Sequence, residues 1–261
     1  MKKTKPFISI ITPTLNDKRK LKKLIANLEK QTFRDFEHII ADGGSTDGTV
    51  EYLKSIKKVD KILVSRDLSM YRGINNALRF CKGKMIGYIN SDDLFADREY
   101  LKKIQKASIK EKIDCIYSGY QVKNIDNGSS KNYIPLKFKS RYLVTLGMPF
   151  CQHTFFWNNK FQKQRFNLKY KVCADFEFIG KILLKSRKIG FLNINSAIFH
   201  KYKKSFGEKN KYTGLSETIK IKNFFKQKKN FNFVFYLFDR ISNFLSNFKF
   251  YNKKLYIINK N

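Results

Sequence analysis

The first third of the chain alternates short apolar runs with segments of helical periodicity, and this alternation restricts the fold more than any other feature. The apolar runs cover residues 7–12, 36–41, 61–65 and 85–89. In the segments between them, apolar side chains recur every three or four positions over residues 17–31, 50–56 and 70–81. Buried strands that alternate with helices through short connections form a parallel sheet with right-handed crossovers. We therefore predict an α/β fold with a mostly parallel sheet flanked by helices.

The pattern is less regular after residue 93. We expect helices over residues 99–107 and 175–184, strands over 114–122, 150–157 and 190–199, and a turn over 124–130. Near the C-terminus, lysines flank apolar residues at a helical spacing: Val234, Leu237, Ile241, Phe244, Leu245 and Phe248. Such a basic amphipathic helix either packs on the preceding domain or lies in a membrane interface with its lysines on anionic head groups. We divide the chain into a domain over 1–205 and a helical, amphipathic extension over 206–261.

The formal charge of +33 comes almost entirely from lysine, which is spread along the chain beside many Asn, Ile and Phe residues. Two interpretations are open: compositional drift in an AT-rich genome, or attraction toward anionic lipid or phosphorylated substrates. No run approaches the ~20 apolar residues of a membrane span, and the run over 7–11 is too short for a signal peptide. We expect a cytoplasmic protein, either free or peripheral on the inner face of the membrane, with reduced cysteines.

A glycine-rich acidic turn follows the second apolar run: Asp42-Gly-Gly-Ser-Thr-Asp-Gly-Thr49. An ordinary interpretation is a tight turn in which Gly43 and Gly44 adopt positive φ and the following Ser or Thr caps a helix. It leaves Asp42 unexplained, because a carboxylate at the end of a buried strand needs a partner. A nucleobase N–H or a ribose hydroxyl would serve as that partner. The turn matches neither the phosphate-binding loop nor the dinucleotide-binding fingerprint.

A second acidic turn, Asn90-Ser91-Asp92-Asp93, follows the fourth apolar run. Adjacent aspartates are common in exposed loops, but at a strand end their like charges repel each other unless a cation lies between them. Mg²⁺ or Mn²⁺ held by one or two carboxylates keeps coordination positions open for phosphate oxygens. Ligands of open α/β sheets bind at the carboxyl ends of the strands. Both turns together predict a nucleotide-linked substrate held with a metal ion.

Four motifs carry a resemblance to a known family: Pro13-Thr14-x-Asn16, Asp42 to Thr49, Asp67-x-x-Met70-Tyr71-x-x-x-Asn75, and Asn90 to Asp93. Their order and spacing resemble those of family 2 glycosyltransferases, and most of all the bacterial polysaccharide and O-antigen branch with its colanic-acid enzymes. The likeness continues through residues 147–151, 155–156 and 174–178. It therefore covers roughly residues 7–199.

The resemblance implies a GT-A (Rossmann-like) fold, with a nucleotide-binding half over about 1–95 and an acceptor half over about 96–205. It implies inverting transfer of a hexosyl or related sugar from a nucleotide-diphosphate sugar to a growing surface polysaccharide or lipopolysaccharide. The acceptor would be a saccharide, and one alternative is a saccharide linked to a polyprenyl diphosphate or another lipid. The residues expected to hold the donor nucleotide are Thr12, Pro13, Thr14, Asn16, Asp42, Gly43, Asp67, Asn75, Ser91 and Asp92.

The same resemblance assigns the chemistry. Asp92 would bind the metal on the diphosphate, and Asp93 would face the donor sugar. Asp175 would be the general base, because displacement at an anomeric carbon needs a base on the acceptor hydroxyl. An ordinary interpretation of Asp175 is the N-cap of the helix that follows. One base inverts the configuration, since no covalent sugar intermediate forms.

The chain departs from the family pattern at several positions. Asn90 replaces the first acidic residue of the usual Asp-x-Asp, and Ser69 stands where glycine is frequent. Arg72 replaces an aspartate and would either reach the diphosphate or be exposed. His153 would either contact the acceptor or be a buried structural histidine. His200 lies where relatives place a loop that closes over the diphosphate.

Two other functions compete with this interpretation. A single-stranded nucleic-acid-binding protein would use the charge and the interleaved lysines and aromatic residues, but no such motif is legible and we expect no nucleic acid as partner. A sugar nucleotidyltransferase would carry a glycine-rich phosphate loop with a basic residue near its N-terminus. Residues 13–16 do not supply one.

Overall fold

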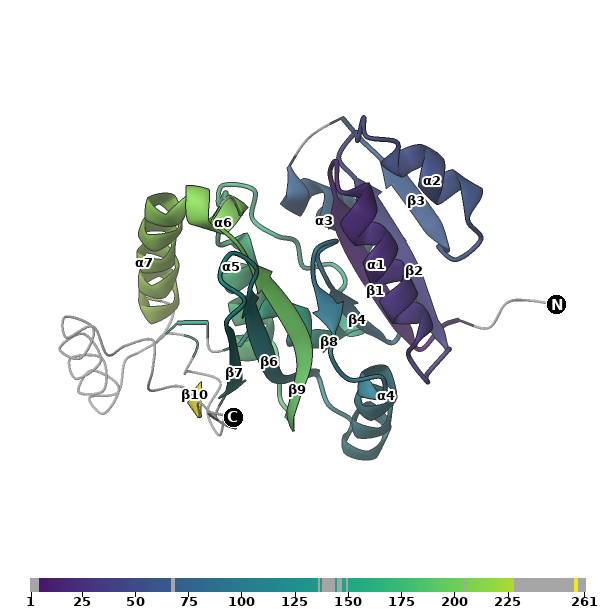
Figure 1. Ribbon diagram of the computed structural model, residues 1–261. Helices are drawn as coiled ribbons and strands as arrows, with labels where there is room; N and C mark the ends of the chain where they lie inside the picture. The colour runs from purple at the N-terminus through teal and green to yellow at the C-terminus, as the bar shows by residue number, and fades with distance from the viewer. Residues whose placement is uncertain are drawn as a thin grey trace.

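The computed structural model describes residues 5–66, 69–135, 137, 144, 147–148, 150–203, 205–227 and 256–257. The described strands form one sheet in the order β10-β7-β6-β8-β4-β1-β2-β3, with β9 beside β6 and β5 beside β9 (Figure 1). The strands are β1 (Ile8–Thr14), β2 (Phe36–Asp42), β3 (Lys61–Val64), β4 (Met85–Tyr88), β5 (Leu94–Phe95), β6 (Cys115–Asn124), β7 (Ser130–Pro135), β8 (Phe156–Asn158), β9 (Ile189–Lys201) and β10 (Tyr256–Ile257). The α-helices are α1 (Lys18–Glu29), α2 (Thr49–Ser55), α3 (Met70–Leu78), α4 (Tyr100–Glu111), α5 (Ala174–Lys185), α6 (Phe206–Lys209) and α7 (Lys211–Gln227).

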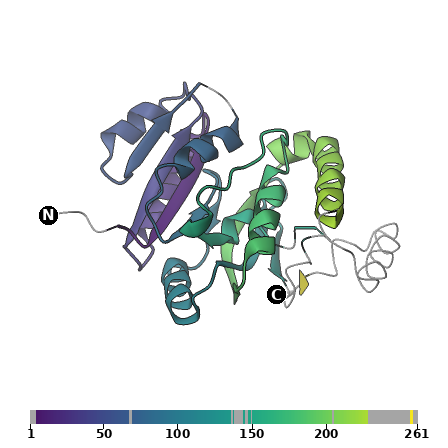
Figure 2. The same cartoon turned by 180° about the vertical axis from the view of Figure 1, so that it is seen from behind.

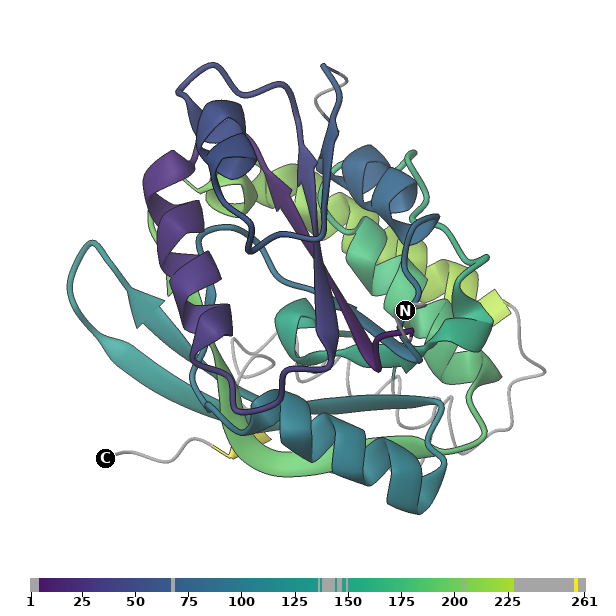
Figure 3. The ribbon, with the colours of Figure 1, turned by 90° about the vertical axis from the view of Figure 1, so that its right-hand side faces the viewer.

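The N-terminal part is the predicted parallel sheet. Strands β3, β2, β1 and β4 run parallel, and the pairing of Thr14 with Asp42 brings the carboxyl ends of β1 and β2 side by side. Successive strand residues face opposite sides: Ile10 packs with α1, and its neighbour Ile11 packs with α3. Helices α1 and α2 therefore cover one face and α3 the other, as Figure 3 shows from the side of the N-terminus.

The second part of the sheet is mixed. Strand β8 pairs antiparallel with both β4 and β6, so it joins the two parts, while β6 pairs antiparallel with β7 and parallel with β9. The turn predicted over 124–130 links β6 to β7. The strand predicted over 150–157 is wrong in its first part, because a 3₁₀ turn over Gln152–Thr154 precedes β8. Thr154 stabilises that turn by donating from its N–H and its hydroxyl to Cys151 O.

Helices α5 and α7 complete the second part on the face that α3 also covers, as the reverse view in Figure 2 shows. Ile221 and Phe225 of α7 enter the same core cluster as Phe176 and Ile179 of α5. The contact is close at Gly180, where an added Cβ would lie 2.3 Å from the ring of Phe225. Helix α7, which follows the domain predicted over 1–205, thus shares its hydrophobic core.

The C-terminal amphipathic helix predicted around residues 234–248 lies outside the described residues. Within the part of the chain that the structure describes, no helix combines the length and the apolar character needed to cross a membrane.

Candidate active site

Asp42 ends β2 and closes the turn that follows it. Its buried carboxylate accepts hydrogen bonds from the N–H groups of Gly44 and Ser45 at 2.9 and 2.8 Å, and from the Ser45 hydroxyl at 2.6 Å. The partner that we expected from a nucleoside is therefore supplied by the turn itself. Gly44 has a φ of 90°, as predicted, whereas Gly43 is not among the positive-φ residues. Helix α2 begins after Gly48, whose φ is 80°, so no serine or threonine side chain caps it.

Asn16 joins this turn to the end of β1. It has a φ of 50°; its N–H donates to the Ser45 hydroxyl, and its Oδ1 accepts from the N–H of Thr46. The N–H of Gly43 donates to Thr14 O. The Thr14 hydroxyl is buried and has no hydrogen-bond partner among the described residues. The ends of β1 and β2 are thus joined by hydrogen bonds, and the Thr14 hydroxyl at this edge of the sheet remains available as a hydrogen-bonding group.

The turn with Asp92 and Asp93 is bound to the end of β9. The backbone N–H of His200 donates to Asp93 Oδ1 at 2.8 Å, and its ring Nδ1 lies 2.5 Å from the carbonyl oxygen of Asp92. The Tyr202 hydroxyl donates to Asp92 Oδ2 at 2.8 Å. Because a carbonyl oxygen only accepts, Nδ1 carries the proton, and Nε2 of the neutral ring is left as an acceptor.

This arrangement fits a divalent cation. Asp92 is only partly buried, and the His200 tautomer presents Nε2 as a potential metal ligand. The described residues contain no group of three or more His, Cys, Asp or Glu side chains arranged to hold a metal. A cation here would therefore take one or two protein ligands and complete its shell with phosphate oxygens and water, which suits Mg²⁺ or Mn²⁺.

Asp93 does not face open space. It is fully buried, and its Oδ2 lies 3.2 Å from Nδ1 of His153, which is also fully buried. Burial raises the pKa of Asp93 well above its usual value and lowers the pKa of His153 to about 4. Both shifts favour a neutral pair. His153 is therefore a buried histidine beside Asp93, and the contact of Asp93 with the donor sugar stays a prediction.

Asp17, directly before α1, and Lys20, in the first turn of α1, also lie beside the turn with Asp92 and Asp93. The Ser91 hydroxyl donates to Asp17 Oδ2 at 2.9 Å, so its proton is used within the fold. Lys20 forms an ion pair with Asp17 at 3.4 Å and donates to the Tyr202 hydroxyl at 3.2 Å. Its ammonium therefore adds a positive charge beside Asp92.

Asp175 lies in the first turn of α5, but it is not the capping residue; that position belongs to Cys173. Burial raises the pKa of Asp175 to about 6, although hydrogen bonds from the N–H of Phe176 and the Tyr71 hydroxyl act in the opposite direction. Tyr71 itself is buried on α3. A carboxylate with a pKa near 6 is ionised at neutral pH and is still a better base than an ordinary aspartate.

A chain of contacts connects Asp175 to the Asp92–Asp93 turn. Tyr88, at the end of β4, is fully buried, and this burial, together with the charge of the nearby Asp175, raises the pKa of the tyrosine well above its usual value. The Tyr88 ring contacts the His153 ring edge to face, with 6.1 Å between centroids, and His153 contacts Asp93. The candidate metal ligand and the candidate base therefore belong to one site, at the carboxyl end of β4.

The other residues predicted for the site are buried, hydrogen-bonded within the fold, exposed or outside the described residues, as follows. Thr12 is fully buried, and its hydroxyl is bonded to His38 in the core. Asn75 uses its side-chain oxygen and nitrogen on the backbone of Phe166. Pro13 is buried at the end of β1, and Arg72 is exposed on α3. Asp67 lies outside the described residues.

The sequence analysis missed Lys20, Tyr88, Tyr202 and Glu217. Tyr88 ends a predicted strand directly before the acidic turn, and that position was a usable signal. Tyr202 and Glu217 gave no local signal, because they reach the site from more than 40 residues away in sequence.

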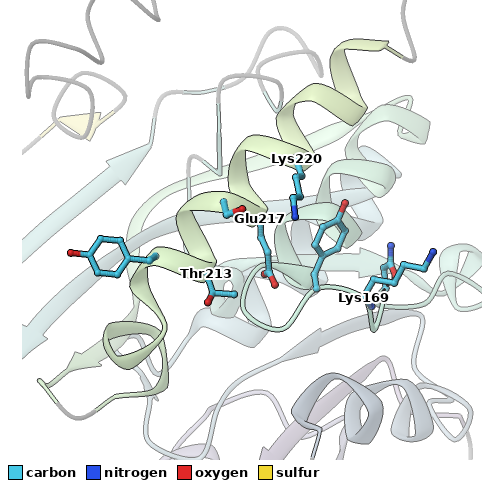
Figure 4. A pocket seen from close by; sticks show the side chains of 8 residues that line it. Lys169, Thr213, Glu217 and Lys220 are labelled. Carbon is cyan, nitrogen blue, oxygen red and sulfur yellow. Dashed lines mark hydrogen bonds between the residues drawn. The ribbon is translucent and has the colours of Figure 1, made fainter.

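A pocket of about 620 Å³ lies between α7 and the loop before α5. Its lining residues are Asn167, Lys169, Tyr170, Tyr212, Thr213, Ser216, Glu217 and Lys220. Figure 4 shows Thr213, Glu217 and Lys220 projecting from α7 toward the side on which Lys169 lies. Glu217, which lines this pocket, also accepts hydrogen bonds from the backbone of Val172 and Cys173, in the segment that leads to Asp175.

Two glycosyltransferases resemble this chain in sequence. A glycosyltransferase of PGL/p-HBAD biosynthesis from Mycobacterium bovis is 25% identical over 231 residues, which cover 85% of this chain and 84% of that protein. The Escherichia coli enzyme WfgD, a UDP-Glc:alpha-D-GlcNAc-diphosphoundecaprenol beta-1,3-glucosyltransferase, is 26% identical over 140 residues, which cover 53% of this chain and 55% of that enzyme.

Two solved structures show the same architecture. S. aureus TarS 1–349 in complex with UDP superposes with a TM-score of 0.65 at 19% identity, over 86% of this chain and 67% of that one. The mannosyltransferase PcManGT from Pyrobaculum calidifontis, in complex with GDP-Man and Mn²⁺, gives 0.62 at 14% identity, over 88% and 66%. The chain spans 39% of the longer TarS chain. These likenesses establish a GT-A-like fold.

The family model decides the identity. The model described as Glycosyl transferase family 2 matches residues 9–181, which is more than half of the chain and includes both acidic turns and Asp175. The chain belongs to glycosyl transferase family 2 and is a glycosyltransferase.

Proposed function

We propose that this enzyme transfers a sugar, with inversion, from a nucleotide-diphosphate sugar to a saccharide acceptor of a surface polysaccharide or lipopolysaccharide, with the help of a divalent metal ion. One observation carries the proposal: Asp92, partly exposed beside His200, and Asp175, with a raised pKa, border the same strand end. Sugar transfer needs these two functions at one place. The UDP and GDP-Man complexes of the structural relatives support a nucleotide donor.

Asp92 and His200 would hold Mg²⁺ or Mn²⁺ on the donor side. Such an ion neutralises the charge that develops on the leaving diphosphate. Tyr202 orients Asp92 by donating to Oδ2, and the proton on His200 Nδ1 keeps Nε2 available. Asp42 and Asn16 fix the turns at the nucleoside end, so they shape the binding edge through their own hydrogen bonds.

Asp175 would act on the acceptor side. It takes the proton of the acceptor hydroxyl as this oxygen attacks the anomeric carbon from the face opposite the diphosphate. Direct attack with a single base inverts the configuration. The pKa of about 6 makes Asp175 an ionised base at neutral pH, and the Tyr71 hydroxyl lies beside it.

The pocket beside α7 is our candidate for the acceptor side. Its lysines, Lys169 and Lys220, suit an anionic group, and the tyrosine ring of Tyr170 suits a sugar face. WfgD, by its name, acts on a diphosphoundecaprenol-linked acceptor. A lipid-diphosphate saccharide would match both features. The net charge of +33 would then favour a position on the anionic inner face of the membrane.

The first experiment identifies the donor. Purified protein is titrated by calorimetry with UDP-, GDP- and dTDP-sugars, first with Mn²⁺ and then with EDTA. We expect one nucleotide class to bind, and chelation to weaken its binding. Binding that EDTA leaves unchanged would refute the metal role of Asp92. Absence of binding to all three classes would refute the donor assignment.

A further inference from the structure

Glu217 of α7 makes an unusual set of contacts for a side chain outside the matched family region. Its Oε1 accepts from the N–H of Lys171 at 2.7 Å, and its Oε2 accepts from the N–H groups of Val172 and Cys173 at 2.9 Å each. The carboxylate is buried. Three consecutive backbone donors therefore converge on one anion, which is a strong arrangement because each hydrogen bond is charge-assisted.

The segment that Glu217 binds leads directly into the base. Cys173 caps α5, and Asp175 lies in the first turn of that helix. The same segment carries Val172 O, which accepts a hydrogen bond of 2.5 Å from the Tyr71 hydroxyl. The Tyr71 hydroxyl also lies beside Asp175. Residues 171–173 are thus held by α7 through Glu217 and by α3 through Tyr71.

Helix α7 also lies unusually close to this segment. At Gly214, an added Cβ would lie 3.2 Å from Cγ1 of Val172. The Cys173 thiol is within 3.4 Å of Gly214 O and 3.5 Å of the Thr218 hydroxyl. Without the buried Glu217 carboxylate, three backbone N–H groups would lose their acceptor, which favours a different path for the segment.

We propose that Glu217 is a positioning residue for the sugar transfer: its carboxylate holds residues 171–173 so that Asp175 and Tyr71 face the acceptor hydroxyl. The inference rests on the proposed function, because it takes Asp175 as the base. Glu217 touches no reacting atom. Its effect is on the geometry and the charge around Asp175.

The decisive variant is Glu217→Gln, compared with Glu208→Gln as matched control. Glutamine keeps the size of the side chain, but its amide nitrogen is a donor and repels the N–H groups that the carboxylate accepted. Glu208 is an exposed glutamate on the neighbouring α6 and forms a surface ion pair with Lys201. We expect Glu217→Gln to lower kcat about 10–100-fold, because small misplacements of a base cost this much. The KM and the calorimetric Kd for the donor should stay at the wild-type level.

The pH profile separates positioning from a purely structural role. The groups that face Asp175 are Tyr71 from α3, Tyr88 from β4, Cys151 and Cys173 from loops, and Glu217 from α7. Burial is the main cause that raises the pKa of Asp175, and the electrostatic interaction with Glu217 acts in the same direction. Glu217→Gln should therefore move the acidic limb of kcat to lower pH, and Glu208→Gln should leave it in place.

A thiol assay tests the contact without any substrate. Cys173 is partly exposed, whereas Cys81, Cys115 and Cys151 are buried. We expect a disulfide reagent to modify Cys173 faster in Glu217→Gln than in the wild type, and Cys173→Ser to abolish the fast phase. If Glu217→Gln fails to fold, Gly214→Ala, which pushes α7 away from Val172, should give the same changes in milder form.

The outcomes are distinguishable. Wild-type kcat, pH profile and Cys173 reactivity in a folded Glu217→Gln protein would overturn the inference. Full turnover by Asp175→Asn would instead refute the proposed base, and faster Cys173 modification in Glu217→Gln would then show that the contact exists without serving that residue.

Discussion

The turn at Asp42, on the proposed donor side, and the segment before the proposed base Asp175 are stabilised in opposite ways. At the donor edge, Asp42 accepts from residues two and three positions ahead of it, so one short turn is self-sufficient. At the base, the segment before Asp175 is held by Tyr71, which lies 101 positions from Val172 in sequence, and by Glu217 of α7. Local contacts leave a legible motif, whereas long-range contacts leave only single residues. The difference also predicts where substitutions act.

The largest effect should come from Asp175→Asn. Asparagine keeps the shape but cannot take a proton at neutral pH, so transfer should fall by about 10²–10⁴-fold, with the donor Kd unchanged. Stability should not fall: the folded state raises the pKa of Asp175 to about 6, so ionisation of this group lowers stability as the pH rises through that value. Turnover assays and thermal melts at pH 7 check both parts. Turnover at the wild-type rate would refute the assignment.

Asp42→Ala should damage the other region by a different route. Two backbone N–H groups and one hydroxyl lose a buried acceptor, which costs about 1–3 kcal/mol of the free energy of unfolding. Donor binding should weaken because the edge loses its shape. Denaturant unfolding measures the first effect and calorimetry the second. Asp35→Ala, which alters an exposed carboxylate at the other end of β2, should change neither.

A pH titration of the wild-type enzyme sharpens the contrast at the base. Since the unprotonated Asp175 is the active form, kcat should rise with pH through about 6 and then level off. The sign follows from the raised pKa: below it the carboxyl holds its proton and cannot accept another. An acidic limb near the usual aspartate value would contradict the burial of this group.

The smallest effect is expected for Tyr202→Phe. The change removes one hydrogen bond to Asp92 Oδ2, and such a bond contributes about 0.5–1.5 kcal/mol. Metal-dependent donor binding should therefore weaken by up to about tenfold. Tyr212→Phe, at an exposed tyrosine of α7 on the proposed acceptor side, is the control for donor binding, which it should leave unchanged. A comparable loss of donor binding with Tyr212→Phe would show that the effect does not come from the hydrogen bond between Tyr202 and Asp92.

The sequence predicted the regular half of the fold well and the site only in part. Strands β1 to β4 and helices α1 to α3 were predicted because apolar periodicity reports burial directly. The strand expected over 150–157 was wrong in its first part because aromatic residues mark burial without fixing the backbone, and Thr154 makes a local turn before β8. Asp42 and Asn75 were placed near the nucleotide, but both spend their polar atoms on backbone groups. A sequence motif does not show whether a polar side chain hydrogen-bonds within the protein or to a ligand.

The bonds from His200 to the Asp92–Asp93 turn set an order of assembly. Strand β4 and its turn are complete in the chain more than 100 residues before His200 is made. Until β9 is in place, Asp92 lacks Tyr202, and Asp93 lacks the His200 N–H that accompanies its burial. The turn with Asp92 and Asp93 is thus incomplete in a nascent chain until β9 and Tyr202 have docked on it, and on the proposed function we expect donor binding only after that step.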